Sequence, residues 1–281
     1  ALDLIYFSLQ DLGHEVERIM TPSHLLPSQE PDLYIINGWF FDKKWLDLPK
    51  DKTIIIQLEN LVAGTLSEKF NPEIFEGFHI WDYSEINRSV FKDVQLGSFH
   101  KITWGYHSCL DFFTPSKSPE TEVLFYGSLT PRRKPILTRI DGFHEVTCAY
   151  NQWGGKMDRL IEGAKCVINI GAFHPKNSIT NEGRIMETLR LAYCANNGVL
   201  VISEKGQDKI ENEYWDRYLE VVSLEDIEET ISELLYEDKY ISKRFQYSEK
   251  YRTETSMKDN MEILLEDTIK SIELKRVYLQ N

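Results

Sequence analysis

The feature that most constrains the fold of this chain is a series of short β-rich segments separated by helix-compatible ones. Four lie in the first half, at residues 32–36, 53–57, 77–81 and 100–104, and are apolar along their length. A strand with one wet face alternates apolar and polar residues, whereas a parallel strand covered by helices on both faces does not. Five more segments follow at 122–126, 145–149, 166–170, 199–203 and 219–222. The pattern predicts an α/β protein with parallel sheets.

The length of 281 residues exceeds the usual size of one domain, so two domains with separate cores are expected. Two prolines and small polar residues between Cys109 and Glu122 are typical of a linker. The sequence therefore predicts a first domain over residues 1–111, a second over 120–250 and a C-terminal helix over 251–281. Residues 2–12 are predicted to form a helix, followed by a short strand through Val16 and Ile19, and a first strand is expected upstream of Ala1.

The composition is that of a soluble globular protein, with 42% hydrophobic and 27% charged residues and no apolar run long enough to cross a bilayer. The formal net charge of -13 repels polyanions and argues against a large nucleic-acid surface. The four cysteines lack C-x-x-C spacing and are expected to be buried, reduced thiols. These properties predict a cytoplasmic protein without a membrane span.

A basic turn follows the strand predicted at 122–126. It carries Gly127, Ser128, Arg132, Arg133 and Lys134. Glycine lets a ligand approach the backbone closely, and the cations balance phosphate charge. The alternative is a solvated helix start, but cations at a helix N-terminus oppose the helix dipole unless an anion is nearby. The turn thus predicts a phosphate site at the carboxyl end of a strand, with Arg133 as its strongest candidate.

A second group of charged residues precedes an apolar helical pattern. Asn181 is expected to cap this helix, with Glu182, Arg184 and Glu187 in or beside its first turns. A carboxylate can accept both hydroxyls of a ribose, which is the role we assign to Glu187. The alternative is simple compensation of the helix dipole. His174, in the loop after residues 166–170, is placed above the same sheet edge, although a lone loop histidine is more often a surface residue.

Polar residues also end two strands of the first half. Glu59 follows residues 53–57 and Asp82 follows 77–81, so each is a candidate general base towards an acceptor hydroxyl. Alternatively, Asp82 and Ser84 cap a helix that starts near Glu85. The sequence does not separate these two readings.

Seven strings occur in one order over most of the chain: IIIQLENL, IWDYSEINRSVF, ITWGYHS, VLFYGSLTPRRKPIL, AKCVINIGAFHP, NEGRIMETL and GVLVISE. Together they resemble the bacterial and viral glycosyltransferases of GT-B fold, whose second domain carries a YG-S and R-R turn, an E-x-R-x-x-E helix start and a strand ending in S-E. The resemblance implies two Rossmann-like domains with parallel sheets facing a central cleft. It also implies that the second domain holds most of a nucleotide-sugar donor and that the C-terminal helix crosses back to the first domain.

In this resemblance the Arg133 and Lys134 turn matches the diphosphate contacts, and Glu187 matches the carboxylate for the donor ribose. One departure concerns Glu182 and Glu187, which are five apart, whereas many retaining members have two glutamates seven residues apart. This spacing therefore does not itself indicate retention of the anomeric configuration. No D-x-D motif is evident, and the resemblance implies transfer without a metal or other cofactor.

The expected function is transfer of a hexose or pentose from a nucleoside-diphosphate donor to a hydroxyl acceptor. The acceptor class stays open among glycans, lipid-linked saccharides, proteins and modified DNA. Two alternatives remain. A sugar-nucleotide epimerase has a similar two-domain shell, and a non-catalytic nucleotide- or glycan-binding module would bind the same ligands without consuming them.

Overall fold

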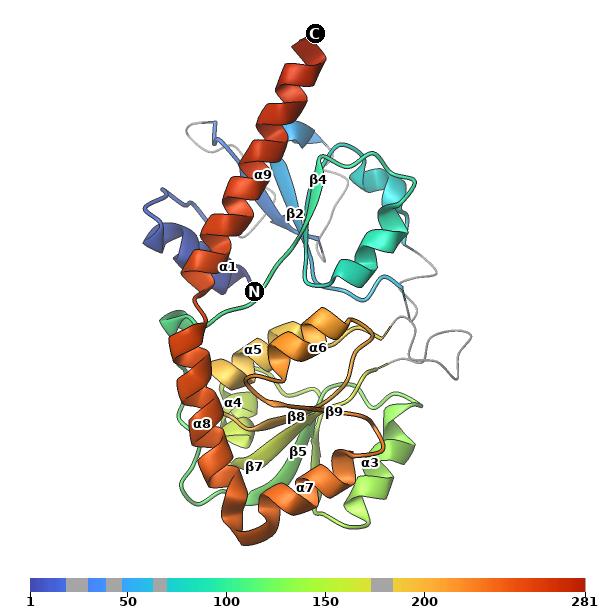
Figure 1. Cartoon of the computed structure of the whole chain (residues 1–281), viewed down its shortest axis with the longest axis vertical. Coiled ribbons are helices and arrows are strands. Elements are labelled where there is room, and N and C mark those ends of the chain that lie inside the picture. Colours follow the sequence, from blue (N-terminus) through green and yellow to red (C-terminus); the bar gives the residue numbers. More distant parts are fainter. Residues whose placement is uncertain (19–29, 39–46, 63–69, 173–183, 281) are drawn as a thin grey trace. The chain divides into compact units, whose positions relative to one another are not determined.

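The computed structural model describes residues 1–18, 30–38, 47–62, 70–172 and 184–280. The chain divides into two compact units (Figure 1). Unit 1 comprises residues 1–103 and 257–281, and unit 2 comprises residues 104–256. Each unit is built on its own parallel sheet, as the strand pattern of the sequence predicts.

Unit 1 contains a four-stranded sheet in the order β1-β2-β3-β4. Its strands are Tyr34–Asn37, Thr53–Gln57, His79–Asp82 and Ser98–Lys101, in that order. Two helices accompany it, α1 (Leu2–Asp11) and α9 (Met257–Gln280), together with 3₁₀ turns at Lys50–Lys52, Pro72–Phe75 and Glu85–Phe91. Strand β2 is buried along its whole length, which explains its uninterrupted apolar sequence.

The core of unit 1 has two parts. One is an aromatic and aliphatic cluster of Ile55, Leu61, Phe75, Phe78, Ile80, Phe91 and Phe99. The other lies under α9, which packs on α1 and β4 (Figure 1). There the indole Nε1 of Trp81 donates a 2.8 Å hydrogen bond to Oγ1 of Thr268, and both residues are fully buried. The C-terminal helix is therefore part of the N-terminal unit.

Unit 2 contains a five-stranded parallel sheet in the order β6-β5-β7-β8-β9. Its strands are β5 (Thr121–Tyr126), β6 (Val146–Ala149), β7 (Ala164–Asn169), β8 (Val201–Glu204) and β9 (Glu220–Val222). The chain places β6 on one side of β5 and then places β7 on the other side. The direction of winding reverses between β5 and β7, and ligands of open α/β sheets bind at the carboxyl ends of such a pair.

Helices cover both faces of this sheet. They are α3 (Arg133–Asp141), α4 (Gly155–Glu162), α5 (Thr188–Asn196), α6 (Lys209–Trp215), α7 (Ile227–Leu235) and α8 (Lys239–Glu254). Because crossovers between parallel strands are right-handed, α3 lies on the face opposite to α4, α5 and α6. Figure 1 shows α3 and α7 together on one side of the sheet and α5 and α6 on the other. Buried residues of α3, α7 and the strands form one continuous core.

The nine strands expected from residue 32 onwards all form, but three local expectations differ. Residues 14–18 form no strand, and Ile19 lies outside the described residues. Helix α5 starts at Thr188, because the carbonyl of Arg184 accepts from the backbone N–H of Gln207 and this contact holds the preceding residues in a loop. The units divide before Trp104, upstream of the proline-containing segment, since the Trp104 indole donates to Thr188 of unit 2 at 3.0 Å.

Two composition-based expectations can also be compared with the structure. No helix in the described part of the chain is long and apolar enough to span a bilayer. The four cysteines are free thiols, of which Cys166 and Cys194 are buried and Cys109 is half-buried. The expectation that all four are buried is wrong for Cys148, which is exposed on the short strand β6 at the edge of the sheet.

Candidate functional site

The candidate site lies at the carboxyl ends of β5 and β7, where the strand order of unit 2 reverses. Strand β5 ends at Tyr126 and continues into Gly127, and β7 ends at Asn169 and continues into Ile170. Helices α3 and α5 start near this edge and direct their first residues towards it. The basic turn predicted from the sequence is therefore at the usual ligand position of this fold.

Gly127 lets two guanidinium groups approach the end of β5. Its φ of +132° is rarely adopted by residues with a side chain. A Cβ atom built on Gly127 would lie 3.1 Å from Nη2 of Arg190 and 3.5 Å from Nη1 of Arg133. The backbone conformation therefore favours glycine, and a side chain at this position would force Arg190 to shift by a few tenths of an ångström.

Arg133 is the first residue of α3 and is only 2% exposed. Its Nε donates to the carbonyl of Ile170 at 2.8 Å and its Nη1 to the carbonyl of Ser128 at 3.1 Å. The remaining nitrogen, Nη2, is buried and has no hydrogen-bond partner among the described residues. Burial and the neighbouring charge of Arg190 lower the pKa of Arg133 to about 10, so it remains a cation at neutral pH. A buried cationic donor without a partner is costly unless a ligand supplies the acceptor.

Arg190 provides a second cation from the first turn of α5. Its Nη1 donates to Oδ1 of Asn169 at 3.1 Å, and its guanidinium lies 4.7 Å from the ring centroid of Tyr126. Asn169 is fixed in turn, because its Nδ2 donates to Oγ of Ser203 at 2.9 Å. Within the described part of the chain Arg190 forms no ion pair, so its charge is left for a ligand.

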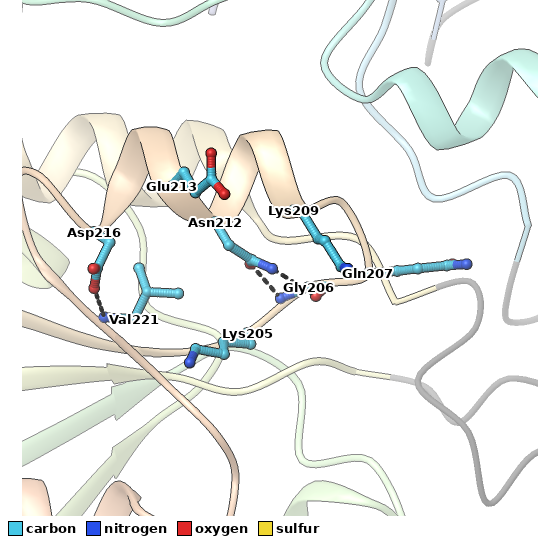
Figure 2. A pocket seen from close by; sticks show the side chains of 8 residues that line it. All are labelled: Lys205, Gly206, Gln207, Lys209, Asn212, Glu213, Asp216 and Val221. Carbon is cyan, nitrogen blue, oxygen red and sulfur yellow. Dashed lines mark hydrogen bonds between the residues drawn. The ribbon is translucent and has the colours of Figure 1, made fainter.

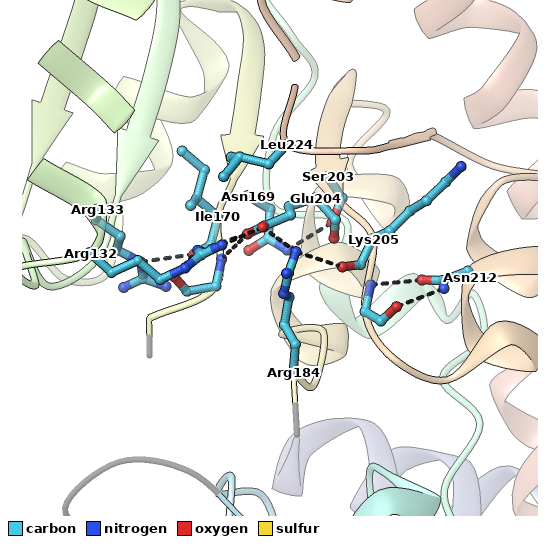
Figure 3. A network of polar contacts seen from close by, with 12 residues as sticks. Arg132, Arg133, Asn169, Ile170, Arg184, Ser203, Glu204, Lys205, Asn212 and Leu224 are labelled. Carbon is cyan, nitrogen blue, oxygen red and sulfur yellow. Dashed lines mark hydrogen bonds and ion pairs between the residues drawn. The ribbon is translucent and has the colours of Figure 1, made fainter. Parts of the chain in front are cut away.

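Glu204, at the end of β8, binds two further arginines (Figure 3). Arg132 donates one hydrogen bond to each carboxylate oxygen, and its bond to Oε2 is 2.9 Å long. Arg184 donates to Oε1. The backbone N–H of Gly171 also donates to Oε2, at 3.0 Å. Glu204 is 2% exposed, so this network is enclosed in the protein. Arg132 and Arg184 therefore shape the site and are not free to bind a ligand with all their donors.

The charges of the site do not cancel. Among the residues that the structure describes here, Arg132, Arg133, Arg184 and Arg190 are opposed by the two carboxylates of Glu187 and Glu204, which leaves two positive charges. Glu187 is the N-cap residue of α5, but its half-buried side chain makes no capping hydrogen bond. Its charge raises the pKa of Arg133, against the larger effect of burial. A net positive site with an unpartnered buried guanidinium suits a doubly charged anion.

Several predicted residues lie at the edge of this site or outside it. Ser128 is exposed and contributes its carbonyl to Arg133. Lys134 is exposed on the first turn of α3 and is not held against the sheet. His174 and Glu182 lie outside the described residues.

Asp82 is fully buried in unit 1. Its Oδ1 accepts from the backbone N–H of Ser84 at 2.8 Å, and both carboxylate oxygens accept from Nδ2 of Asn87. Burial raises the pKa of Asp82 well above its ordinary value. Ser84 caps the turn at Glu85–Phe91 through a bond to the N–H of Ile86, as the capping reading predicts. The enclosed carboxylate holds this turn in place and is closed to an acceptor.

Glu59 is half-buried after the end of β2, and its carbonyl accepts from Nδ2 of Asn87 at 2.8 Å. Asn87 thus joins Glu59 to Asp82, so the two candidate bases are linked through one side chain. Glu59 is the more accessible of the two.

A pocket of about 500 Å³ lies on unit 2 beside α6 (Figure 2). It is lined by Lys205, Gly206, Gln207, Lys209, Asn212, Glu213, Asp216 and Val221. Asn212 bonds both the N–H and the carbonyl of Gly206 and so fixes the loop between β8 and α6. None of the predicted site residues that the structure describes lines this pocket. We therefore place the site at the switch point, where the unpartnered cation lies.

Sequence reasoning missed Arg190 and Glu204. Arg190 obeys the rule that drew attention to Arg133, since it is a cation in the first turn of a helix. If the helix started at Asn181, as the sequence predicts, Arg190 would lie more than two turns inside it and not in its first turn. Glu204 was noted only as the end of a strand, because nothing local shows that Arg132 and Arg184 converge on it.

Solved glycosyltransferase structures have a similar fold. AviGT4, a glycosyltransferase involved in avilamycin A biosynthesis, matches with a TM-score of 0.53 and 16% identity over 97% of this chain and 89% of that one. An α1,3-fucosyltransferase matches with a TM-score of 0.51 and 12% identity over 96% of this chain and 84% of that one. TarM of S. aureus matches with a TM-score of 0.51 and 12% identity over 85% of this chain.

This chain spans 54% of the TarM chain, about half of its length. At these identities the likeness establishes the fold, an α/β architecture of GT-B type with two Rossmann-like units. No protein-family model and no curated protein matches the sequence.

Proposed function

We propose that this protein is a glycosyltransferase that moves a sugar from a nucleoside-diphosphate donor to a hydroxyl acceptor. The observation that carries the proposal is the unpartnered Nη2 of Arg133, which is buried at the switch point of unit 2. A diphosphate is the group of such a donor that satisfies both this nitrogen and the net positive charge. The fold shared with solved glycosyltransferases supports the same assignment.

The chemistry follows from the charge that develops during transfer. Cleavage of the bond between the sugar and the β-phosphate leaves negative charge on the diphosphate. Arg133 and Arg190 are held by Ile170 and Asn169 before the donor arrives, so they stabilise this charge without reorganising. Cations that bind the leaving group more tightly as its charge grows accelerate the step. We propose transfer without a metal ion or other cofactor, and Glu187 as the carboxylate for the donor ribose.

We also propose that the transfer retains the anomeric configuration. An inverting transfer needs a protein base for the acceptor hydroxyl, and Asp82, one of the two candidates, is fully buried. In a retaining transfer the departing phosphate itself accepts the acceptor proton. Analysis of the product anomer by NMR checks this directly, and inversion would point to Glu59 or another base.

The acceptor is proposed to be a hydroxyl on a glycan, a lipid-linked saccharide, a protein or modified DNA, reached in the cytoplasm. The net charge of -13 favours acceptors that are not polyanions. Among the fold neighbours, TarM has been crystallised with UDP and alpha-GlcNAc-glycerol, and the fucosyltransferase with GDP. These ligands belong to those proteins, and they define a first set of donors to screen here.

The test is a screen of nucleotide sugars for release of nucleoside diphosphate, with and without acceptors. We expect turnover with at least one donor and a loss of at least about 100-fold in Arg133→Ala. Lys134→Ala removes an equal charge from the neighbouring exposed position and is the matched control. Conversion of the donor sugar without acceptor would favour an epimerase. Binding without any donor consumption would favour a non-catalytic module, and normal turnover by Arg133→Ala would refute the proposed site.

A further inference from the structure

The loop between β6 and α4 exposes two aromatic side chains. Trp153 is 82% exposed and Tyr150 is 56% exposed. In contrast, three other tryptophans are at most 1% exposed, namely Trp81, Trp104 and Trp215. A tryptophan exposed to this degree gains nothing from the protein core, whereas its flat ring is well suited to bind another flat ring.

This loop starts directly beside the candidate anion site. Strand β6 pairs with β5 in a register that sets Ala149 opposite Tyr126, and the N–H of Gly127 donates to the carbonyl of Ala149 at 3.1 Å. Adjacent strands are about 4.8 Å apart, so Tyr150 begins one strand spacing from Gly127. A ribose joined to a diphosphate at Gly127 would carry its base over this loop.

The backbone of the loop leaves space for a ligand. Asn151 and Gly154 both have a φ of +55°, and Gly155 follows as the first residue of α4. A Cβ atom built on either glycine would meet no atom within 4 Å. Because a side chain at either glycine would meet no neighbouring atom, the protein surface next to Trp153 is open.

We propose that the loop of residues 150–155, with Trp153 and Tyr150, is the platform on which the nucleobase of the donor stacks. The inference rests on the proposed function, since it assumes a nucleoside diphosphate at the switch point. Stacking on an aromatic ring tolerates every base, because each base has a π-face. The platform therefore gives affinity for the nucleoside without selecting the base.

The opposite side of the site is less suited to a base. There the end of β8 carries Glu204, whose carboxylate is occupied by Arg132 and Arg184. The pocket beyond it is lined mostly by charged and amide side chains and by no aromatic residue. Only the β6 side joins the anion site to exposed rings in the described part of unit 2.

The test measures binding of UDP, GDP and inorganic pyrophosphate to the full chain by calorimetry. Trp153→Ala is expected to raise the Kd for both nucleotides by about 10-fold or more and to leave pyrophosphate binding unchanged. Trp153→Phe keeps a ring and is expected to restore most of the affinity. Because Trp153 is exposed, Trp153→Ala is expected to unfold at the wild-type urea concentration, which separates lost stacking from lost folding.

The ligands separate the two proposals. If pyrophosphate binds through Arg133 and the double variant Tyr150→Ala/Trp153→Ala binds UDP and GDP like wild type, the platform is refuted and the diphosphate site stands. If neither nucleotides nor pyrophosphate bind, both proposals fall. A second readout is the quenching of tryptophan fluorescence by nucleotide, which Trp153→Phe is expected to reduce while nucleotide still binds.

Discussion

The missing side chain of Gly127 is what allows Arg190 to reach the end of β5: a Cβ atom at that position would lie 3.1 Å from Nη2 of Arg190. Arg190 lies 63 residues further along the chain, yet its position depends on this glycine. The same glycine lies 3.5 Å, measured from the built Cβ atom, from Nη1 of Arg133. That distance is an ordinary van der Waals contact, so the steric requirement at Gly127 comes from Arg190.

Gly127→Ala is expected to displace the guanidinium group of Arg190 and to weaken UDP and GDP binding by at least about 10-fold. The positive φ adds a folding cost of about 1–3 kcal/mol. Gly13→Ala is the control, because Gly13 also has a positive φ, of +89°, but a Cβ there meets no atom within 4 Å. Calorimetry is expected to show a binding loss in the first variant alone, and equal affinities would mean that the arginines adapt.

Arg190→Ala is expected to weaken nucleotide binding about 10- to 100-fold, because it removes a charge-assisted bond to phosphate. Lys134→Ala changes the net charge equally but removes only an exposed cation, so its effect is expected to stay below about 3-fold at physiological salt. Titrations at low and high salt check the difference. A direct contact keeps its effect in high salt, and two variants that lose affinity equally would show that only long-range charge matters.

Glu204→Gln is expected to destabilise unit 2 by about 3–5 kcal/mol, since Arg132 and Arg184 would keep their buried charges without a carboxylate. Glu254→Gln is the control, because its pair with Arg217 is at the surface and is worth at most about 1 kcal/mol. Hydrogen exchange of the β7 and β8 amides reports on the affected region. Unchanged protection in Glu204→Gln would show that the two arginines find other acceptors.

His79 is expected to make unit 1 less stable in acid. Burial, and then the charge of Lys275, lower its pKa from 6.5 to about 4. The unfolded chain therefore binds a proton on this histidine before the folded chain does, so its contribution is complete above pH 6.5 and is lost as the pH falls towards 4. The loss amounts to about 3 kcal/mol.

Urea unfolding between pH 7.5 and pH 4 checks this expectation. His79→Gln is expected to flatten the pH dependence, and replacing the exposed His14 in the same way is the control. A wild-type slope in His79→Gln would assign the acid sensitivity to other groups.

The strands were predictable because burial on both faces makes each of them continuously apolar, as in β2. The basic turn was predictable because Gly127 and Arg133 lie only six residues apart in the sequence. The fold class followed from the alternation of such strands with helical segments. These are local or regularly repeated patterns, and a single sequence displays them directly.

The rest of the site depends on contacts between distant residues. The start of α5 was misplaced because Arg184 bonds the loop at Gln207, which only the folded chain brings near. Asp82 looked available because a strand end is usually open, but Asn87 covers its carboxylate. Arg132 looked free because its partner, Glu204, is 72 residues away. The spacing of residues in the sequence does not reveal such long-range contacts.

The hydrogen bond from Trp81 to Thr268 joins residues 187 positions apart, and the intervening chain includes all of unit 2. During synthesis unit 2 can complete its sheet while Trp81 still lacks the helix that covers it. Unit 1 must therefore wait for α9, which is translated after unit 2, with its apolar surface exposed to chaperones in the meantime. Premature termination before α9 would accordingly damage unit 1 more than unit 2.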